Sequence, residues 1–116
     1  MTPEGKVKDR VKQTLKRHGI WFFMPPASAM GKAGVPDFVC IYPGRKHGYF
    51  LGIETKAGGN DLTAMQRWCR HEIISSNGLY LVVNESNIDT LDMVLDSLSR
   101  VELMRDQQSY QYDTGQ

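Results

Sequence analysis

The chain contains 116 residues, of which 41% are hydrophobic and 23% are charged, and it has only two cysteines. This composition is typical of an ordinary globular domain that is large enough to bury one core without disulfides. No apolar run approaches the roughly 18 residues of a membrane span, and the polar start of the chain does not resemble a signal peptide. Cys40 and Cys69 are too far apart for a zinc-binding pair, so we expect reduced thiols in a cytoplasmic protein.

The net charge of +1 conceals an uneven distribution along the chain. Residues 1–70 carry 12 basic and 5 acidic side chains, a net charge of +7, whereas residues 71–116 carry 2 and 8, a net charge of −6. A basic half joined to an acidic half suggests one face for a polyanion and another face turned away from it. Charge alone leaves nucleic acid as one of several candidate ligands.

Hydrophobic periodicity predicts the first elements. Residues 3–18 place an apolar side chain every four positions among basic residues, which predicts an amphipathic helix with Thr2 as its N-cap. Glu4 lies in the first turn on the inward side of this helix, where it could reach a site at the helix end. The apolar run at residues 20–24 predicts a buried strand whose aromatic side chains belong to the core or to a subunit interface.

A loop and a hairpin are predicted next. The loop, at residues 25–34, consists of small residues, and Ser28 and Lys32 are its side chains suited to binding a phosphate. Residues 38–42 and 49–53 are rich in β-branched and aromatic residues and flank a turn of proline, glycine and polar residues. This pattern predicts a β-hairpin.

The hairpin brings acidic side chains together. If its strands pair symmetrically about residues 45 and 46, Asp37 lies opposite Glu54. Two facing carboxylates destabilise a sheet unless a cation lies between them, and a hard divalent metal prefers such oxygen ligands. Lys56 is two residues beyond Glu54 and therefore points to the same face of the strand. In the alternative interpretation no metal is bound: Asp37 caps a turn, and Glu54 and Lys56 lie on a solvated strand face. However, charges at the ends of buried strands must be paired or bound to a ligand.

A second helix follows the hairpin. Thr63 and Gln66 form a capping box, which is one interpretation of Gln66, and a role in a site is the other. We expect Arg67 on this helix to be available to solvent or to a backbone phosphate. The expected buried stripe comprises Met65, Trp68, Cys69 and Ile73.

The last part of the chain adds one strand and one helix. A nearly continuous apolar run at residues 79–83 predicts a covered strand. Residues 88–98 predict an amphipathic helix with three aspartates on its solvent side. The sequence is polar and aperiodic over residues 104–116, where we expect a frayed tail. No repeat or linker divides residues 1–103, which we expect to form one domain.

Three motifs now stand in order on the expected elements: Gly34-Val35-Pro36-Asp37, Glu54-Thr55-Lys56, and Gln66 in the following helix. Together they resemble the PD-(D/E)xK nuclease superfamily, and more narrowly its VRR-NUC (virus-type replication-repair nuclease) domain in the compact stand-alone form of phages and bacteria. The resemblance runs from Glu4 to about Val83. It implies an α/β fold with a restriction-endonuclease-like core, in the order α-β-β-β-α-β-α, and a mixed central sheet flanked by helices.

The resemblance also implies a divalent-metal-dependent endonuclease that hydrolyses phosphodiester bonds. Asp37 and Glu54 would bind Mg²⁺ or Mn²⁺, with the Thr55 carbonyl and water completing the site. Lys56 would orient the attacking water or stabilise the charge of the transition state. The other matching positions are Glu4, as an acidic residue on the first helix that could join the metal site, Gln66, as the polar helix residue of the active site, and Ser28, as a loop serine of junction-resolving relatives.

The family implies a substrate and an assembly as well. We expect branched DNA or a four-way (Holliday) junction in a bacterial or phage-infected host cell, bound in part by Ser28, Lys32 and Arg67. We also expect a homodimer, because symmetric cutting of a junction needs two active sites. Two alternatives are a DNA-binding module that keeps the nuclease fold without catalysis and a small structural protein with solvated charges. The complete catalytic set favours the enzyme, and RNA stays open as a substrate because backbone cleavage requires no reading of bases.

Overall fold

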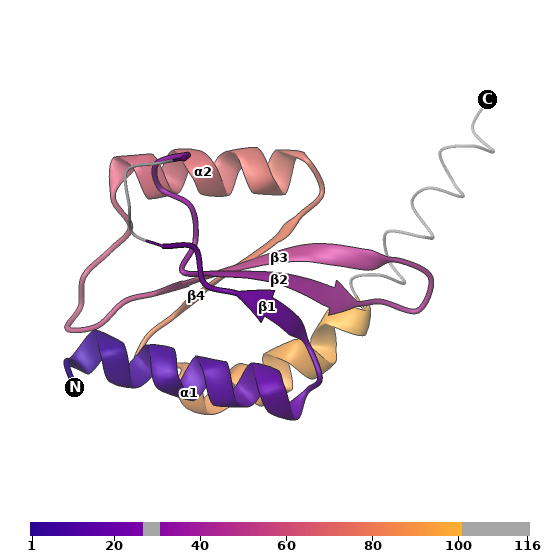
Figure 1. Ribbon diagram of the computed structural model, residues 1–116, viewed down its shortest axis with the longest axis horizontal. Helices are drawn as coiled ribbons and strands as arrows, with labels where there is room; N and C mark the ends of the chain where they lie inside the picture. The colour runs from indigo at the N-terminus through magenta and orange to yellow at the C-terminus, as the bar shows by residue number, and fades with distance from the viewer. Residues whose placement is uncertain (27–30, 101–116) are drawn as a thin grey trace.

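The computed structural model describes residues 1–26 and 31–100 of the chain (Figure 1). Its elements in chain order are helix α1 (Pro3–Arg17), strands β1 (Trp21–Phe23), β2 (Phe38–Pro43) and β3 (Gly48–Thr55), helix α2 (Ala64–Ser75), strand β4 (Leu79–Val83) and a 3-10 helix η1 (Ile88–Thr90) that leads into a helix at residues 91–100. The predicted order α-β-β-β-α-β-α is therefore confirmed. Ser28 and the predicted tail at residues 104–116 lie outside the described residues.

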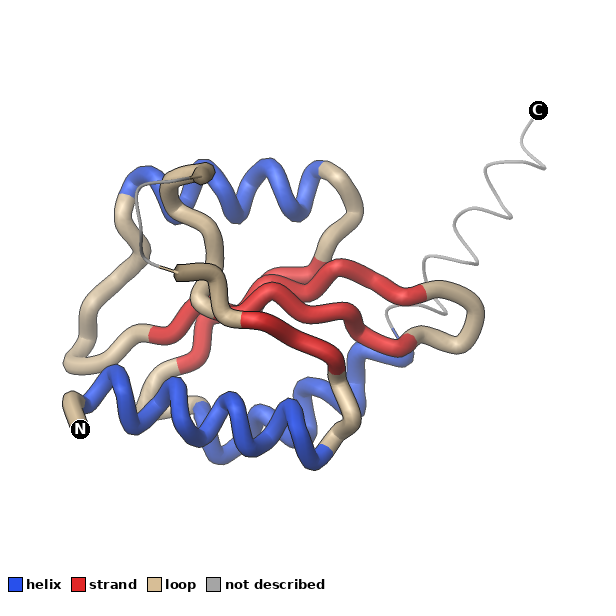
Figure 2. The backbone as a smooth tube through the Cα atoms, in the orientation of Figure 1, coloured by secondary structure: helices blue, strands red, loops and turns tan. Residues whose placement is uncertain are grey.

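One mixed four-stranded sheet forms the centre of the molecule, with the strand order β1-β2-β3-β4 (Figure 2). β2 pairs antiparallel with both β1 and β3, and α2 carries the chain over to β4, which runs parallel to β3. In the hairpin, Phe38 is paired with Ile53, which is the register expected from the symmetric turn. β2 begins one residue after Asp37, so the hairpin brings Asp37 and Glu54 to the same end of the sheet.

The core lies between one face of the sheet and the layer formed by α1 and the helix at residues 91–100 (Figure 1). One stripe of α1 points into this core, as its periodicity predicts, and alternate residues of β2 and β3 do the same. Among the described residues, no helix is long and apolar enough to span a membrane. The buried side chains of this core include Val7, Val11, Leu15, Phe38, Cys40, Leu51, Ile53, Leu91 and Leu95.

The opposite face of the sheet is covered only in part, which corrects one expectation. β1 is an edge strand in which Phe22 packs against the core, whereas Trp21 is 57% exposed and Phe23 is 47% exposed. Directly paired residues share a face, so Ile41 and Phe50 continue the exposed row that begins at Trp21. The prediction of a buried strand is therefore wrong for most of β1, because α2 packs chiefly against β4 and leaves this face of β1 and β2 open.

α2 also packs differently from the prediction. Within the predicted buried stripe, Cys69 is buried, but Met65 is 53% exposed and Trp68 is 60% exposed. The helix is turned so that Gln66 faces the sheet, where its side-chain amide donates a hydrogen bond to Glu54. Met65 and Trp68 therefore point away from the core.

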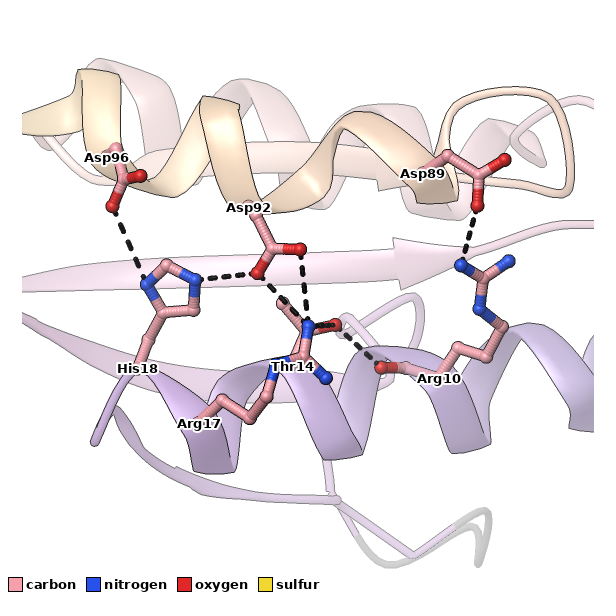
Figure 3. Close-up of polar contacts among 7 residues, drawn as sticks. All are labelled: Arg10, Thr14, Arg17, His18, Asp89, Asp92 and Asp96. Atoms are coloured by element: carbon pink, nitrogen blue, oxygen red, sulfur yellow. Dashed lines mark hydrogen bonds and ion pairs between the residues drawn. The ribbon is translucent and has the colours of Figure 1, made fainter.

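The acidic helix at residues 91–100, together with η1, meets basic α1 through polar contacts (Figure 3). The hydrogen bond from His18 lowers the pKa of Asp92. The aspartates were expected to face solvent, and they do stay exposed, but they also neutralise cations of α1. The acidic half is thus not simply turned away from the basic half. The pairs are Arg10–Asp89 (2.6 Å), Arg17–Asp92 (3.1 Å), His18–Asp92 (2.8 Å) and His18–Asp96 (3.7 Å).

Candidate functional site

The segment that leads to Asp37 is held between α2 and β3. Gly34 has a φ of +77°, which favours glycine, and a Cβ at this position would lie 2.4 Å from the Met65 carbonyl oxygen. Pro36 covers Gly52 of β3 so closely that a Cβ on Gly52 would lie 2.8 Å from the proline Cγ. The two glycines thus let this segment contact both elements, and Asp37 follows at a fixed point beside the end of the hairpin.

The two carboxylate oxygens of Asp37 have different surroundings. Oδ2 accepts hydrogen bonds from the Thr55 hydroxyl at 2.6 Å and from the Thr55 N–H at 2.9 Å. Oδ1 lies 3.8 Å from Lys8 Nζ, and the Asp37 side chain is 25% exposed. Thr55 therefore fixes the carboxylate by one oxygen and leaves the other available to bind a cation.

Glu54 lies beside Asp37 and is almost completely buried, with its side chain 3% exposed. Its Oε1 accepts a hydrogen bond from the Asp37 N–H at 3.1 Å, and its Oε2 accepts one from Gln66 Nε2 at 2.6 Å. Burial, together with the neighbouring Asp37 carboxylate, raises the pKa of Glu54 to about 7. A cation at this point would offset both effects and keep the glutamate ionised.

Lys56 and Gln66 lie in the same cluster, as the motifs predicted. Lys56 Nζ is 3.8 Å from Glu54 Oε2, with 11% of the lysine side chain exposed. The Lys56 N–H donates to the Val83 carbonyl at 2.9 Å, which ties the residue to β4. Gln66 forms the expected capping box with Thr63 and also contacts Glu54, so its side chain serves both the helix end and the site.

The oxygen atoms of this cluster fit a metal that takes few protein ligands. Among residues 1–26 and 31–100, no group of three or more His, Cys, Asp or Glu side chains is arranged to hold a metal ion. Asp37 and Glu54 bring two carboxylates to one place, and Mg²⁺ commonly binds one or two carboxylates and completes its shell with water and substrate phosphate. The pair therefore fits Mg²⁺ or Mn²⁺. Glu4 is paired with Lys8 at 3.4 Å, so it reaches Asp37 only through that lysine.

Lys8 is a residue of the cluster that the sequence analysis did not identify. It lies four positions after Glu4 on α1, a spacing at which an acid and a base pair on one helix face. That spacing is the signal that could have found it. Its ammonium group adds a second positive charge to the one supplied by Lys56, and two cations beside two carboxylates suit a phosphate group that approaches a metal.

The residues predicted to bind phosphate away from the hairpin take part in ion pairs. Lys32 lies 3.0 Å from Glu72 of α2, and Arg67 lies 2.6 Å from Asp61. The side chains of both cations are more than half exposed, at 57% and 58%. Contact of Lys32 and Arg67 with DNA stays a prediction, as does that of Ser28.

Comparison with solved structures places this geometry among known folds. A structure described as "VRR_NUC domain" has a TM-score of 0.64 and 22% sequence identity, covering 78% of this chain and 95% of its own. A second, described as "VRR_NUC domain protein", has a TM-score of 0.61 and 25% identity, covering 83% of this chain and 87% of its own. No protein-family model and no curated protein matches the chain. The chain therefore has the fold of the VRR_NUC domain, as the resemblance of its motifs implied.

Proposed function

We propose that the protein is a divalent-metal-dependent endonuclease that hydrolyses phosphodiester bonds in DNA. The observation that carries this proposal is the contact of Asp37, Glu54 and Lys56 at one end of the sheet, where two carboxylates and a mostly buried lysine meet. The structural likeness to VRR_NUC domains supports it. A protein that only binds DNA would have no need to bury these charges together, because burial of unpaired charge is costly.

Each side chain of the cluster has a distinct task in this proposal. Asp37 and Glu54 hold the metal, while Thr55 and Gln66 keep the two carboxylates in place through hydrogen bonds of 2.6 Å each. A bound divalent metal supplies positive charge at the phosphate and lowers the pKa of a water molecule. Lys56, held against Glu54, orients the attacking water or stabilises the negative charge that develops on the phosphate.

Branched DNA, including four-way junctions, is the substrate that we propose. The cluster acts on the phosphate backbone, whose contacts position a nucleic acid but carry no sequence information. Selection then depends on the shape and flexibility of the DNA rather than on its base sequence. The cations Lys8, Lys32 and Arg67 supply positive charge for the DNA backbone.

A homodimer would bring two such sites to one branched substrate. The surface that we propose for this contact is the exposed sheet face, defined as Trp21, Phe23, Ile41 and Phe50, whose exposures range from 41% to 57%. Phe50 also lines a cleft of about 940 Å³ between α2 and the hairpin, so the apolar surface continues beneath the helix. The four side chains that define the exposed sheet face are all apolar, which is the composition of the core of a protein interface and not of a surface that binds phosphates.

Cleavage of end-labelled DNA tests the nuclease. Wild type, Lys56→Ala and a control variant, Lys12→Ala, which removes an exposed lysine from α1, are each incubated with a four-way junction, a flap and a linear duplex in Mg²⁺, Mn²⁺ or EDTA. Metal-dependent cutting that is lost only in Lys56→Ala is expected, with a preference for the branched substrates. Binding without cutting in both metals would instead favour a DNA-binding module. The same junction made with RNA strands tests the alternative substrate.

The oligomeric state tests the exposed sheet face. Ile41→Glu places a charge within it, and the matched control Met93→Glu places a charge on a methionine that is 72% exposed on the helix at residues 91–100. Sedimentation equilibrium should give a dimeric mass for wild type and Met93→Glu and a monomeric mass for Ile41→Glu. A monomeric wild type at working concentration would refute the dimer and leave the cleavage result unaffected.

A further inference from the structure

Asp37 already has a cation beside the oxygen that Thr55 does not hold. The Thr55 hydroxyl and N–H donate to Asp37 Oδ2 at 2.6 Å and 2.9 Å, whereas Oδ1 lies 3.8 Å from Lys8 Nζ. The same ammonium group lies 3.4 Å from Glu4 Oε2. Lys8 therefore bridges two carboxylates, one in the cluster and one on its own helix.

The contact between Lys8 and Asp37 lies where water can reach it. The two side chains are 33% and 25% exposed, whereas the Lys56–Glu54 pair has exposures of 11% and 3%. Because water and salt screen an exposed ion pair, such a contact contributes little stability and its partners can exchange. A lysine ammonium is a compact charge on a flexible stem, so it can leave one carboxylate and keep the other. Of the two lysines in the cluster, Lys8 is thus the one that a competing cation can displace.

Glu4 gives a displaced ammonium group another partner. It lies four positions before Lys8 on α1, and an acid that precedes a lysine by four residues is the favourable order for a helical ion pair. This contact depends only on the helix, so it persists whether or not Lys8 also contacts Asp37. An ammonium group that is held by Glu4 alone stays next to the cluster without occupying an oxygen of Asp37.

We propose that Lys8 is a placeholder cation, which balances the charge of Asp37 in the metal-free protein and moves to Glu4 when a divalent metal binds the carboxylate pair. This rests on the proposed nuclease function, and it assigns Lys8 and Glu4 to the control of metal affinity rather than to metal binding. One carboxylate oxygen does not hold an ammonium group and a divalent metal together, because the two positive charges repel. Once released from Asp37, the ammonium group is available to a phosphate of the bound DNA.

Binding of Mn²⁺ alone, without DNA, tests the competition, because electron paramagnetic resonance measures the free ion directly. Lys8→Met removes the charge but keeps an unbranched stem, and it should bind Mn²⁺ about twofold to fivefold more tightly than wild type, the range that an exposed ion pair supplies. Lys8→Arg keeps the charge and should bind no more tightly than wild type. Lys12→Met is the matched control, because it removes an exposed lysine one turn further along α1. Equal or weaker binding by Lys8→Met, or the same gain in Lys12→Met, would overturn the proposal.

A double-mutant cycle tests the part of Glu4. Glu4→Gln deprives Lys8 of its second partner, so the ammonium group stays on Asp37 and Mn²⁺ should bind more weakly than to wild type. In the double variant Glu4→Gln/Lys8→Met no placeholder is left, and its affinity should lie within about twofold of that of Lys8→Met. If Glu4 were itself a ligand, its loss would weaken binding by the same factor with and without Lys8. That result would overturn the proposal.

Failure of this proposal and failure of the nuclease function give different results. If Lys8→Met binds Mn²⁺ more tightly than wild type but wild type cuts no DNA in either metal, the nuclease function fails and the placeholder stands. If wild type cuts DNA and Lys8→Met binds Mn²⁺ no more tightly, the placeholder is refuted and the nuclease stands. Binding of Mn²⁺ that is unchanged in Asp37→Asn would refute both, because the metal would then lie elsewhere.

Discussion

The variant Glu54→Gln should stabilise the metal-free protein above neutral pH, although it removes a residue that we propose to bind the metal. In wild type, burial and the neighbouring Asp37 carboxylate raise the pKa of Glu54 from 4.5 to about 7. Keeping this carboxylate ionised in the folded state therefore costs free energy. Glutamine has nearly the same shape and carries no charge, so it avoids that cost.

The cost has a defined dependence on pH. Between pH 4.5 and about 7, the folded state retains a proton on Glu54 that the unfolded state has released, so the free energy of unfolding falls as the pH rises. At about 1.4 kcal/mol per pKa unit, wild type loses about 2.5 kcal/mol from this residue between about pH 5 and about pH 8. Glutamine has one acceptor oxygen where glutamate has two, and the lost hydrogen bond costs about 1 kcal/mol at every pH. The variant should therefore match wild type near pH 5 and exceed it by about 2 kcal/mol near pH 8.

Urea unfolding of both proteins in EDTA at these two pH values measures the difference. A stability difference that is the same at both pH values would refute the reasoning, because Glu54 would then release its proton as easily in the folded as in the unfolded state. Saturating Mg²⁺ should reverse the order near pH 8, since a metal that binds only the intact carboxylate pair stabilises wild type alone.

Three further predictions concern the same cluster and the core. Mg²⁺ or Mn²⁺ should raise the melting temperature of wild type by mass action, and Asp37→Asn should remove this gain; a gain that persists in the variant would place the metal elsewhere. Thr55→Val should slow metal-dependent cutting because it deletes the hydroxyl that holds Asp37 at 2.6 Å, whereas Thr55→Ser should restore it; equal rates for the two variants would contradict this role. Burial raises the pKa of the Cys40 thiol to about 12, so iodoacetamide should label Cys40 only in urea. Mass spectrometry of the peptides measures this, and labelling of Cys40 in the native protein would contradict its burial.

The hairpin and its carboxylates could be predicted because they depend on local sequence. The turn fixes the pairing of Phe38 with Ile53, and alternation then assigns Leu51 and Ile53 to the core face and Glu54 to the other. A slip of one residue would expose two apolar residues and bury the glutamate in the core. The hydrophobic pattern and the turn therefore agree on one register, and that register already brings Asp37 beside Glu54.

The packing of α2 could not be predicted in the same way. Cys69 belongs to two possible stripes, one with Met65 and Trp68 and the other with Gln66 and Ile73, and both have helical spacing. Hydrophobicity favours the first stripe. The structure has the second, because Gln66 hydrogen-bonds the buried Glu54 from a distant part of the chain. The exposure of Trp68 is thus a consequence of the site.

The strand β1 was predicted, but its exposure was not, and the place of Lys8 in the cluster was missed for a related reason. An apolar edge strand has the same local pattern as a buried one, and its exposure is decided by which strands α2 covers. In the sequence, Lys8 looks like the other basic residues on the surface of α1. Only the packing of α1 beside the end of the hairpin brings its Nζ within 3.8 Å of Asp37 Oδ1. Layer packing, which local patterns do not encode, determines both.

Gly34→Ala tests whether the segment before Asp37 positions the site as the packing indicates. Its φ of +77° disfavours alanine, and the new Cβ would lie 2.4 Å from the Met65 carbonyl oxygen, a backbone atom that cannot move without displacing α2. Strain at this φ and overpacking should together cost about 2–4 kcal/mol.

Gly58→Ala is the matched control for this substitution, because Gly58 has a φ of +65° but nothing within 4 Å of the new Cβ. It should lose only the strain, about 1 kcal/mol in urea unfolding. Displacement of α2 would also move Gln66 away from Glu54, so Gly34→Ala should cut DNA more slowly than Gly58→Ala even where both are fully folded. Equal stability and equal cutting by the two variants would mean that the contact with α2 does not position Asp37.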